Sequence, residues 1–317
     1  MTNLLNFETF HIDRKNVEMH LSNSKVEFYS KELSGWVKFL DRYSKLSEER
    51  EILFCALRKN HEVIASCVLV RGTIHVDQEL IPFYFLTQAI TNPQFRGQGL
   101  FRTLLEEVEV VAKARKVSVL ATIARRAVAD FYWKLGFQGF SHFPEYINIR
   151  RDKGVTQDLF RYAELCDVDQ LQLCHSNSRA LSNSRIARSV VDWEFIVNEG
   201  KSGNYQVLLP KNSAHCNYLI VKEDCVIELS KCDSIVNECE FYTLVNKSFN
   251  QLKLDSMHPI SNFLLGNSWK YRERFESKEG HLLKVIGPIT LNSRYFLDEV
   301  VLKFGKHRLE ISEIDQW

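Results

Sequence analysis

The stretch from Asn92 to Leu105 constrains the fold of this 317-residue chain more than any other. An apolar run with strand character, Ile81 to Thr91, ends just before it, two glycines lie in its middle, and a helical pattern begins at Leu100. The first amides of a helix have no partners inside the helix, and the helix dipole places partial positive charge there. The order strand, tight loop, helix therefore predicts a site for an anion, to which Arg96 adds a full positive charge.

The two glycines, Gly97 and Gly99, allow backbone dihedrals that other residues disfavour and let a phosphate approach the backbone closely. Their spacing fits neither a mononucleotide P-loop nor the three-glycine loop of dinucleotide-binding folds. The segment instead resembles the pyrophosphate loop of the GNAT acyltransferases, in which Arg or Gln is followed three residues later by Gly and then by Gly or Ala. Arg96 and Gly99 fit this pattern, and the resemblance extends from Pro93 to Leu105, but Phe101 stands where the last small residue usually is.

A second segment, Ala129 to Phe137, reads Ala-Asp-Phe-Tyr-Trp-Lys-Leu-Gly-Phe. It predicts a short helix that Gly136 ends in a left-handed conformation, after which Phe137 returns to the core. It resembles the GNAT segment in which Phe-Tyr is followed by x-Lys-Leu-Gly-Phe. Since it follows the glycine loop with one strand between them, the two segments together give a resemblance to the GNAT family that covers roughly residues Val26 to Arg150.

This resemblance implies acetyl-CoA as the acyl donor, with its pyrophosphate on the loop amides and its pantetheine arm along the end of the preceding strand. It also implies direct attack of a neutral amine on the thioester, with Tyr132 as the general acid that protonates the departing thiolate. A phenol with an unperturbed pKa of about 10 is protonated at neutral pH. The cofactor-binding residues implied are Ala89, Ile90, Thr91, Arg96, Gly97, Gln98, Gly99, Leu100 and Phe101.

Other patterns in the first half agree with a mixed sheet. The apolar runs Ile52–Leu57 and Val63–Val70, joined by a short polar link, predict an antiparallel hairpin. The runs Ile81–Thr91 and Val117–Ile123 are expected to pair in parallel through a helical crossover. One face of that helix should be buried. Its apolar residues are Leu100, Leu104, Leu105, Val108, Val111 and Ala112.

Before the hairpin, residues 1–24 are expected to form an N-terminal arm, followed by a short strand over Val26–Tyr29 and a helix over Leu33–Leu46. The GNAT domain itself is expected over residues 25–152 and a second domain over residues 153–317.

The second half repeats the order of predicted elements found in the first. Helices are expected near Asp167 and over Ser184–Asn198. Three strands, a helix over Glu238–Lys253, a short apolar run and a helix near Ile260–Leu265 should follow. The predicted fold class is therefore α/β with mixed sheets: a GNAT domain followed by a second, degenerate GNAT-like domain. An unrelated α+β domain is the alternative.

The chemistry of the first half is not repeated in the second. Residues 233–239, at the place of the glycine loop, contain no glycine and two carboxylates, and Asn262 stands at the place of Tyr132. A tandem layout with one active copy resembles the enhanced-intracellular-survival type of acetyltransferases. One acetyl-CoA per chain is expected.

Composition narrows the remaining possibilities. With 41 Lys plus Arg against 40 Asp plus Glu, the net charge of +1 gives a nucleic-acid partner no support. Residues Met1 to His20 contain no apolar core of signal-peptide length, and no run approaches the roughly 18 apolar residues of a membrane span, so a soluble, cytoplasmic protein is expected. The eight cysteines form no Cys-x-x-Cys pair and have no matched His spacing, which predicts free, structural thiols and no metal site.

The acceptor is left open by the sequence. The leading hypothesis is an N-acetyltransferase acting on a primary amine of a small-molecule or sugar acceptor. A protein or peptide N-acetyltransferase and a non-catalytic acyl-CoA sensor or scaffold are the alternatives. His75, Asp77 and Glu79 are candidates for the base that accepts the amine proton, with solvated loop residues as the alternative.

Overall fold

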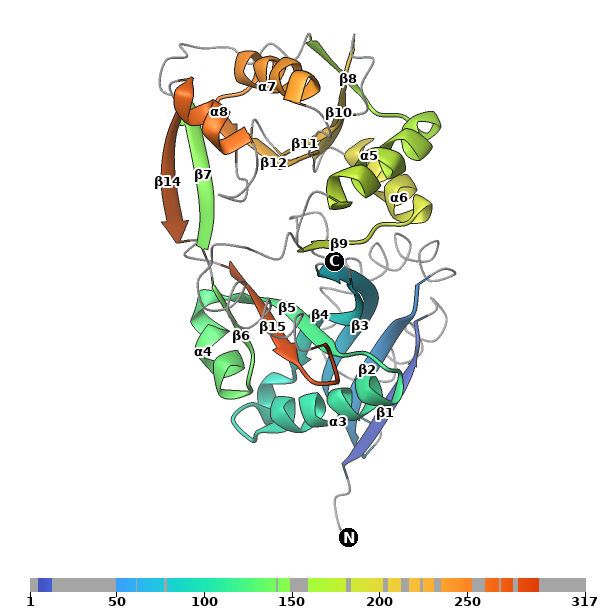
Figure 1. Ribbon diagram of the computed structural model, residues 1–317. Helices are drawn as coiled ribbons and strands as arrows, with labels where there is room; N and C mark the ends of the chain where they lie inside the picture. Colours follow the sequence, from blue (N-terminus) through green and yellow to red (C-terminus); the bar gives the residue numbers. More distant parts are fainter. Residues whose placement is uncertain are drawn as a thin grey trace.

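The computed structural model contains two mixed sheets with helices packed on their faces (Figure 1). The residues it describes are 5–12, 50–60, 62–76, 79–140, 142–148, 159–180, 184–201, 205–211, 217–222, 225–230, 235–252, 260–267, 269–275 and 279–290. The strand expected over Val26–Tyr29 and the helix expected over Leu33–Leu46 lie outside these ranges.

The first sheet has the strand order β1-β2-β3-β4-β5-β15-β6, and a short strand, β9, pairs with β3 off this path. Its strands are β1 (Asn6–His11), β2 (Ile52–Lys59), β3 (Glu62–Val76), β4 (Glu79–Thr91), β5 (Val119–Arg125), β6 (Gln138–Phe140), β9 (Ser184–Ile186) and β15 (Glu279–Val285). The antiparallel β2–β3 hairpin and the parallel β4–β5 pair confirm the two pairings predicted from the sequence. Strand β1 lies within the expected N-terminal arm.

Two helices of the first half, α3 (Leu100–Ala114) and α4 (Arg126–Lys134), position the glycine loop and Tyr132. Helix α3 connects β4 to β5, and helix α4 connects β5 to β6. The buried face of α3 consists of the six residues predicted from helical spacing, and it packs on one face of the first sheet. Gly136 ends the α4 segment with a φ of 86°, the left-handed conformation expected of it.

The second sheet has the order β14-β7-β13-β12-β11-β10-β8. Its strands are β7 (His142–Asn148), β8 (Phe160–Tyr162), β10 (Gln206–Pro210), β11 (Leu219–Lys222), β12 (Cys225–Leu229), β13 (Gln251–Leu252) and β14 (Trp269–Phe275). Its helices are α5 (Val168–Ala180), α6 (Val190–Lys201), α7 (Ile235–Ser248) and α8 (Ile260–Gly266). Short 3-10 turns cover Pro93–Phe95 (η1) and Leu165–Asp167 (η3).

Apart from β9, the two sheets have the same pattern of pairing, strand for strand. Each begins with antiparallel pairs and continues through one parallel pair (β4–β5 and β12–β13). The penultimate strand is then antiparallel to both of its neighbours. The helix between the parallel strands is α3 in one sheet and α7 in the other. The second half therefore repeats the fold of the first, as its order of elements predicted.

The penultimate strand of each sheet comes from the other half of the chain. Strand β15, near the C-terminal end of the described residues, lies between β5 and β6, while β7 from the first half lies between β13 and β14. Figure 1 shows β15 in the lower lobe beside β5 and β7 in the upper lobe beside β14. Residues 25–152 thus supply β7 to the second sheet, and residues 153–317 supply β15 and the short β9 to the first.

The helix expected over Ser184–Asn198 begins later than predicted. Residues 184–186 instead form β9 and pair with β3, and α6 begins at Val190. The physical reason is a reciprocal cap: the Ser189 amide donates to the Asp192 carboxylate at 2.6 Å, and the Asp192 amide donates to the Ser189 hydroxyl at 3.3 Å. This cap fixes the helix start after the segment that reaches the first sheet.

The prediction of free thiols is wrong for Cys174, which is disulfide-bonded. Five other cysteines of the described chain are free: Cys55, Cys67, Cys166, Cys225 and Cys239. Cys55 and Cys67 are buried cross-strand partners in β2 and β3, where they act as small apolar residues.

Candidate functional site

Strand β4 changes direction at a bulge shortly before its end. The pairing between β3 and β4 shifts so that Cys67 opposes two residues, Gln88 and Ala89. Gln88 has a φ of 51°, a left-handed conformation that is uncommon outside glycine. A bulge of this kind bends the strand that carries it. The parallel ladder between β4 and β5 ends at the pair Leu86–Thr122, just before the bulge.

The end of β4 is open although β4 lies in the middle of the sheet. Tyr84 and Leu86 are fully buried, whereas Gln88 and Ala89 are exposed, and Ile90 and Thr91 are half-buried. Among the described residues, no strand pairs with the β5 side of β4 after Leu86. Backbone groups at an unpaired strand edge can hydrogen-bond an extended ligand. Ala89, Ile90 and Thr91, the three strand residues expected to contact the donor, lie at this edge.

The glycine loop follows β4 directly. Asn92 begins it by accepting a hydrogen bond from the Gln94 amide at 3.0 Å, which starts η1. Gly97 and Gly99 have φ values of 78° and 74°, and a Cβ added to either would meet no atom within 4 Å. These glycines are therefore required by backbone conformation and not by lack of space.

The loop presents positive potential to solvent. The first hydrogen bond within α3 runs from the Thr103 amide to the Gly99 carbonyl at 3.2 Å, so the amides of the preceding helical residues have no intrahelical acceptor. The first turn of α3 contains no acidic residue. Arg96 and Gln98 are exposed, and Arg96 Nε donates to the Thr91 carbonyl at 3.2 Å, which ties the loop to the end of β4. This arrangement suits a polyanion.

Tyr132 lies in α4, close to the point at which β4 and β5 separate. Thr122, the last β5 residue paired with β4, donates from Oγ1 to the Leu86 carbonyl at 2.8 Å, and its side chain also interacts with the Tyr132 hydroxyl. Burial raises the pKa of Tyr132 to about 12, helped by the nearby Cys67 and opposed by the hydrogen bond with Thr122. Tyr132 is therefore a protonated phenol at neutral pH.

Three phenylalanine rings surround the Tyr132 ring. Phe137 contacts it edge-on, with centroids 5.3 Å apart and the ring planes at 84°. Phe131, the preceding residue, also meets it edge-on at 5.8 Å. Phe101, expected among the donor-binding residues, packs on Tyr132 at 5.8 Å and 79° and on Phe131 at 5.6 Å. The first turn of α3 and helix α4 are joined by these contacts.

Two of the three candidate bases lie far from the bulge. His75 pairs with Leu80 at the opposite end of the β3–β4 hairpin, and Glu79 begins β4 and accepts a hydrogen bond from Thr290 at 2.6 Å. At about 3.3 Å per residue, the seven residues from Glu79 to Leu86 span roughly 23 Å of strand. The structure therefore does not bring His75 or Glu79 to the open edge. Asp77 lies outside the described residues.

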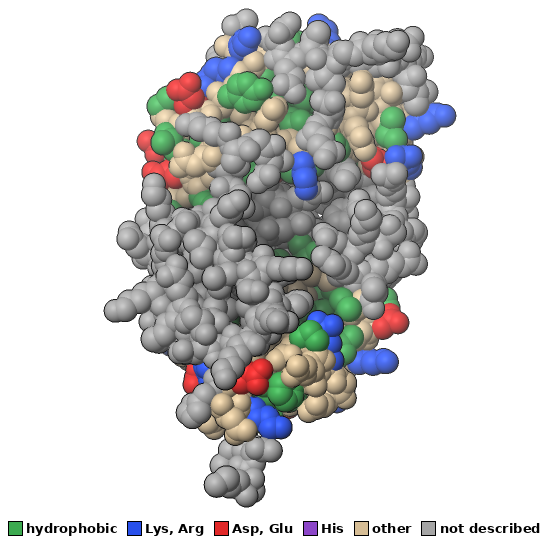
Figure 2. Space-filling model, turned by 180° about the vertical axis from the view of Figure 1, so that it is seen from behind, with side chains coloured by type: hydrophobic (Ala, Val, Ile, Leu, Met, Phe, Trp, Pro, Cys, Tyr) green, Lys and Arg blue, Asp and Glu red, His purple; other side chains and the backbone are tan. Residues whose placement is uncertain are grey.

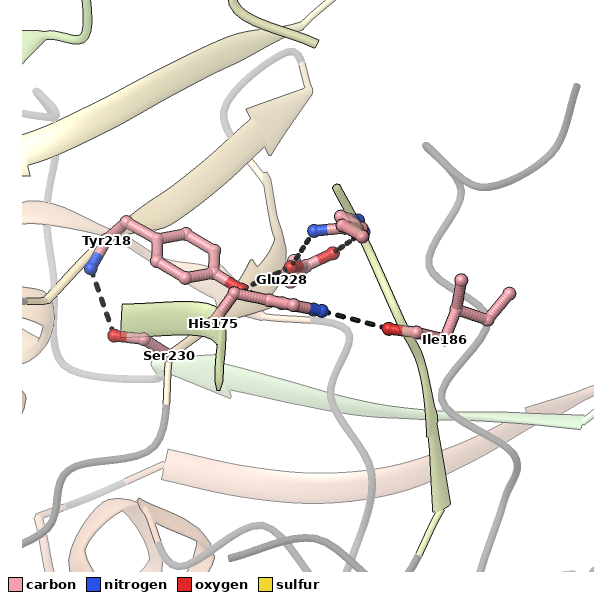
Figure 3. A network of polar contacts seen from close by, with 6 residues as sticks. His175, Ile186, Tyr218, Glu228 and Ser230 are labelled. Atoms are coloured by element: carbon pink, nitrogen blue, oxygen red, sulfur yellow. Dashed lines mark hydrogen bonds and ion pairs between the residues drawn. The ribbon is translucent and has the colours of Figure 1, made fainter. Parts of the chain in front are cut away.

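The second half has a corresponding bulge in β12, and buried side chains around Glu228 occupy the space next to it. Its parallel ladder ends at Val226–Leu252, after which one extra residue, Ile227, shifts the pairing of β12 with β11. The next residue, Glu228, accepts two bonds from Arg188 at 2.6 and 2.7 Å and one from the Tyr218 hydroxyl at 2.7 Å (Figure 3).

The buried network around Glu228 extends into α5 and β9. His175 meets the Tyr218 hydroxyl with Nδ1 at 3.0 Å and donates from Nε2 to the Ile186 carbonyl at 2.9 Å (Figure 3). The residues of this network are all at most 5% exposed. Asn262, at the place of Tyr132, is exposed on α8. Residues 233–234 lie outside the described chain, so the absence of a glycine loop there is known from sequence alone.

Sequence reasoning missed two parts of this site. The bulge carries no sequence signal, since Thr87–Thr91 reads as an ordinary continuation of an apolar strand. Thr122 could have been found as a hydroxyl inside the apolar run Val117–Ile123, because a buried hydroxyl needs a hydrogen-bond partner.

Other kinds of site find no support in the described part of the chain. It contains no group of three or more His, Cys, Asp or Glu side chains placed to hold a metal, and no helix long and apolar enough to cross a membrane. On the face seen in Figure 2, the described acidic and basic side chains are dispersed, with no region of a single sign.

Part of the chain matches a known protein family. Residues 19–137 match the model of the acetyltransferase (GNAT) family. A GCN5-related N-acetyltransferase from Kribbella flavida has a similar structure, with a TM-score of 0.61 at 14% identity, over 89% of this chain and 71% of that one.

Two further structures are similar over 89% of this chain. One is a GCN5-related N-acetyltransferase from Anabaena variabilis (TM-score 0.60, 12% identity, 73% of that chain). The other is Eis1 from Mycobacterium abscessus (TM-score 0.57, 12% identity, 74% of that chain). A search of curated protein sequences gives no match.

Proposed function

Residues 19–137 belong to the acetyltransferase (GNAT) family, and from this premise we propose that the chain is an N-acetyltransferase that transfers an acetyl group from acetyl-CoA to a primary amine of a small-molecule or sugar acceptor. The observation that carries the proposal is the position of Tyr132, a protonated phenol beside the point where β4 leaves β5. The proposal includes a cytoplasmic location, as the sequence analysis expects.

The residues present fit the donor. The exposed loop Arg96–Gly99 and the first turn of α3 would hold its pyrophosphate, through amides that lack intrahelical acceptors and through the charge of Arg96. The open edge at Ala89, Ile90 and Thr91 would pair with the amide groups of its pantetheine arm. When bound, acetyl-CoA supplies an activated acetyl thioester.

In this proposal, Tyr132 acts at the end of the reaction. A neutral amine attacks the thioester carbonyl, and the C–S bond breaks as the N–C bond forms. Tyr132 gives its hydroxyl proton to the departing sulfur and regains one from solvent, which takes up the proton that the amine loses. A high pKa keeps the phenol protonated until that moment. No cysteine has to act as nucleophile, and Cys67 is fully buried.

The first test is CoA release over a panel of sugar, small-molecule and peptide amines with the variant Tyr132→Phe. Loss of a general acid should lower kcat by roughly 10²–10⁴-fold with little change in donor affinity. Tyr242→Phe, which removes the hydroxyl of a buried tyrosine on α7, is the matched control. Turnover of peptides alone would favour a protein acetyltransferase. Donor binding without turnover of any amine would favour a sensor.

The second test separates charge from backbone strain at the loop. Gly99→Glu should abolish acetyl-CoA binding in calorimetry, because the carboxylate would face the pyrophosphate. Gly99→Ala carries the same left-handed strain at a φ of 74°, and its methyl group meets no atom within 4 Å. It should therefore keep most of the affinity. Equal affinities in both variants would remove the loop from the proposed site.

A further inference from the structure

We propose that Phe101 is a positioning residue for Tyr132, whose ring edge contact with the phenol fixes the acid against Thr122 and keeps water away from it. The inference rests on the proposed function for its catalytic consequence, but its structural part is independent of any reaction. Phe101 stands at the second position of α3, directly after the glycine loop.

The geometry of the contact supports this role. The rings of Phe101 and Tyr132 lie 5.8 Å apart at 79°, the edge-to-face arrangement that aromatic rings favour. Phe137 meets the phenol in the same manner at 5.3 Å and 84°. Phe101 is half-buried and Tyr132 only 7% exposed.

The Tyr132 hydroxyl interacts with Thr122, which is itself fixed by its bond to the Leu86 carbonyl. The position of the phenol oxygen therefore depends on the ring being held where it is. Truncation of Phe101 would remove one of the rings that hold it and open the Tyr132 ring to solvent from the side of α3.

The chemistry of the acid gives this contact a measurable effect. Desolvation is the largest cause of the raised pKa of Tyr132, so any residue that excludes water from the ring keeps the phenol protonated. Water admitted beside the hydroxyl would stabilise the phenolate and lower the pKa toward its usual value. A phenol that is free to rotate would also present its proton to the departing sulfur in a smaller fraction of encounters.

Phe101 also joins the anion-binding turn to the acid. Its backbone belongs to the first turn of α3, next to the amides available to an anion, while its ring lies on Phe131 and Tyr132 of α4. This side chain therefore links the two parts of the site directly, beside the core contacts that Leu100 and Leu104 of α3 make in the cluster that includes Tyr132.

The test uses the full chain labelled with ¹³Cζ-tyrosine, without donor or acceptor, and follows ionisation by NMR up to pH 10.5. The Tyr132 signal is assigned by its loss in Tyr132→Phe. With a pKa of about 12, Tyr132 in the unmodified chain should be almost entirely protonated at pH 10.5. Phe101→Ala should show a clear phenolate fraction at the same pH, and Phe101→Leu an intermediate one. Val110→Ala, on the exposed side of α3, is the matched control and should match the unmodified chain.

A second readout uses turnover and calorimetry. Phe101→Ala should lower kcat by roughly 5- to 30-fold with the dissociation constant for acetyl-CoA within about twofold, since a positioning contact acts on the acid and not on donor binding. An unchanged Tyr132 ionisation in folded Phe101→Ala would overturn the proposal. So would weaker donor binding with kcat intact, which would make Phe101 a donor contact. If no amine is acetylated at all, the proposed function fails while the ionisation result still decides the role of Phe101.

Discussion

Replacement of Arg188 by Met tests the buried network of the second half. Arg188 donates to both oxygens of Glu228 at 2.6 and 2.7 Å, and the two side chains are 1% and 6% exposed. The guanidinium also lies 4.9 Å from the Trp193 ring centroid. Met keeps much of the apolar volume of the Arg stem but removes the charge and both donors, which leaves the Glu228 carboxylate in a buried site without its ion pair.

The expected cost is large. Removing one partner of a buried ion pair typically lowers the free energy of unfolding by about 3–5 kcal/mol, against a total of roughly 5–15 kcal/mol for a domain. The Tyr218 hydroxyl still donates to Glu228 at 2.7 Å, which favours the lower end of that range. In Arg188→Met/Glu228→Leu, no uncompensated carboxylate is left, and most of the loss should be recovered.

The assay is urea denaturation followed by tryptophan fluorescence and circular dichroism. Trp193, one of the five tryptophans of the chain, is fully buried beside Arg188, so its share of the emission reports on this region. A loss below about 1 kcal/mol in Arg188→Met would place the pair among weak surface pairs and refute the reasoning. A double variant no more stable than Arg188→Met would refute it too, because the cost would then come from packing around the stem.

Two further predictions concern the first half. Burial acts to raise the pKa of Glu51, but hydrogen bonds from Tyr84, Arg115 and Arg71 outweigh it and hold the pKa below the usual 4.5. Glu51 therefore contributes stability above its unfolded pKa, and this stability is lost as pH falls through the folded pKa. The difference in unfolding free energy between the unmodified chain and Glu51→Gln, measured by urea denaturation, should shrink from pH 6 to pH 3. A constant difference would contradict this. Gly72→Ala would place a Cβ 2.4 Å from Phe83 Cε1 and should cost about 1–3 kcal/mol by overpacking, with rescue in Gly72→Ala/Phe83→Leu; a thermal melt unchanged by Gly72→Ala would contradict the contact.

The sequence predicts the local parts of the site well, because each depends on neighbours along the chain. The buried face of α3 follows from helical spacing, and the left-handed Gly136 follows from its place after a short helix. Arg96, Gly97 and Gly99 lie in the loop between β4 and α3 as expected. Periodicity and turn chemistry act within a few residues, so they can be read from one sequence.

The parts that sequence could not predict depend on register and on distant partners. Whether β4 pairs with β5 to its end is decided by a one-residue shift against β3, for which the apolar pattern gives no sign. Helix α6 begins later than the sequence predicts because β3, far away in sequence, pairs with residues 184–186. The exchange of β7 and β15 between the sheets cannot be predicted either, because an apolar strand pattern does not indicate which strand it pairs with.

The exchange of β7 and β15 between the two halves affects how the protein folds during synthesis. The two strands that flank α4 are β5 and β6. Both pair with β15, which is made only after every other described strand. Domains usually fold in the order of synthesis. Here the half that carries the glycine loop and Tyr132 is made first and completed last. A chain cut short by a premature stop or by a protease before β15 would lack the strand beside β5 and β6, so under the proposed function acetyl transfer would report that synthesis had run through β15.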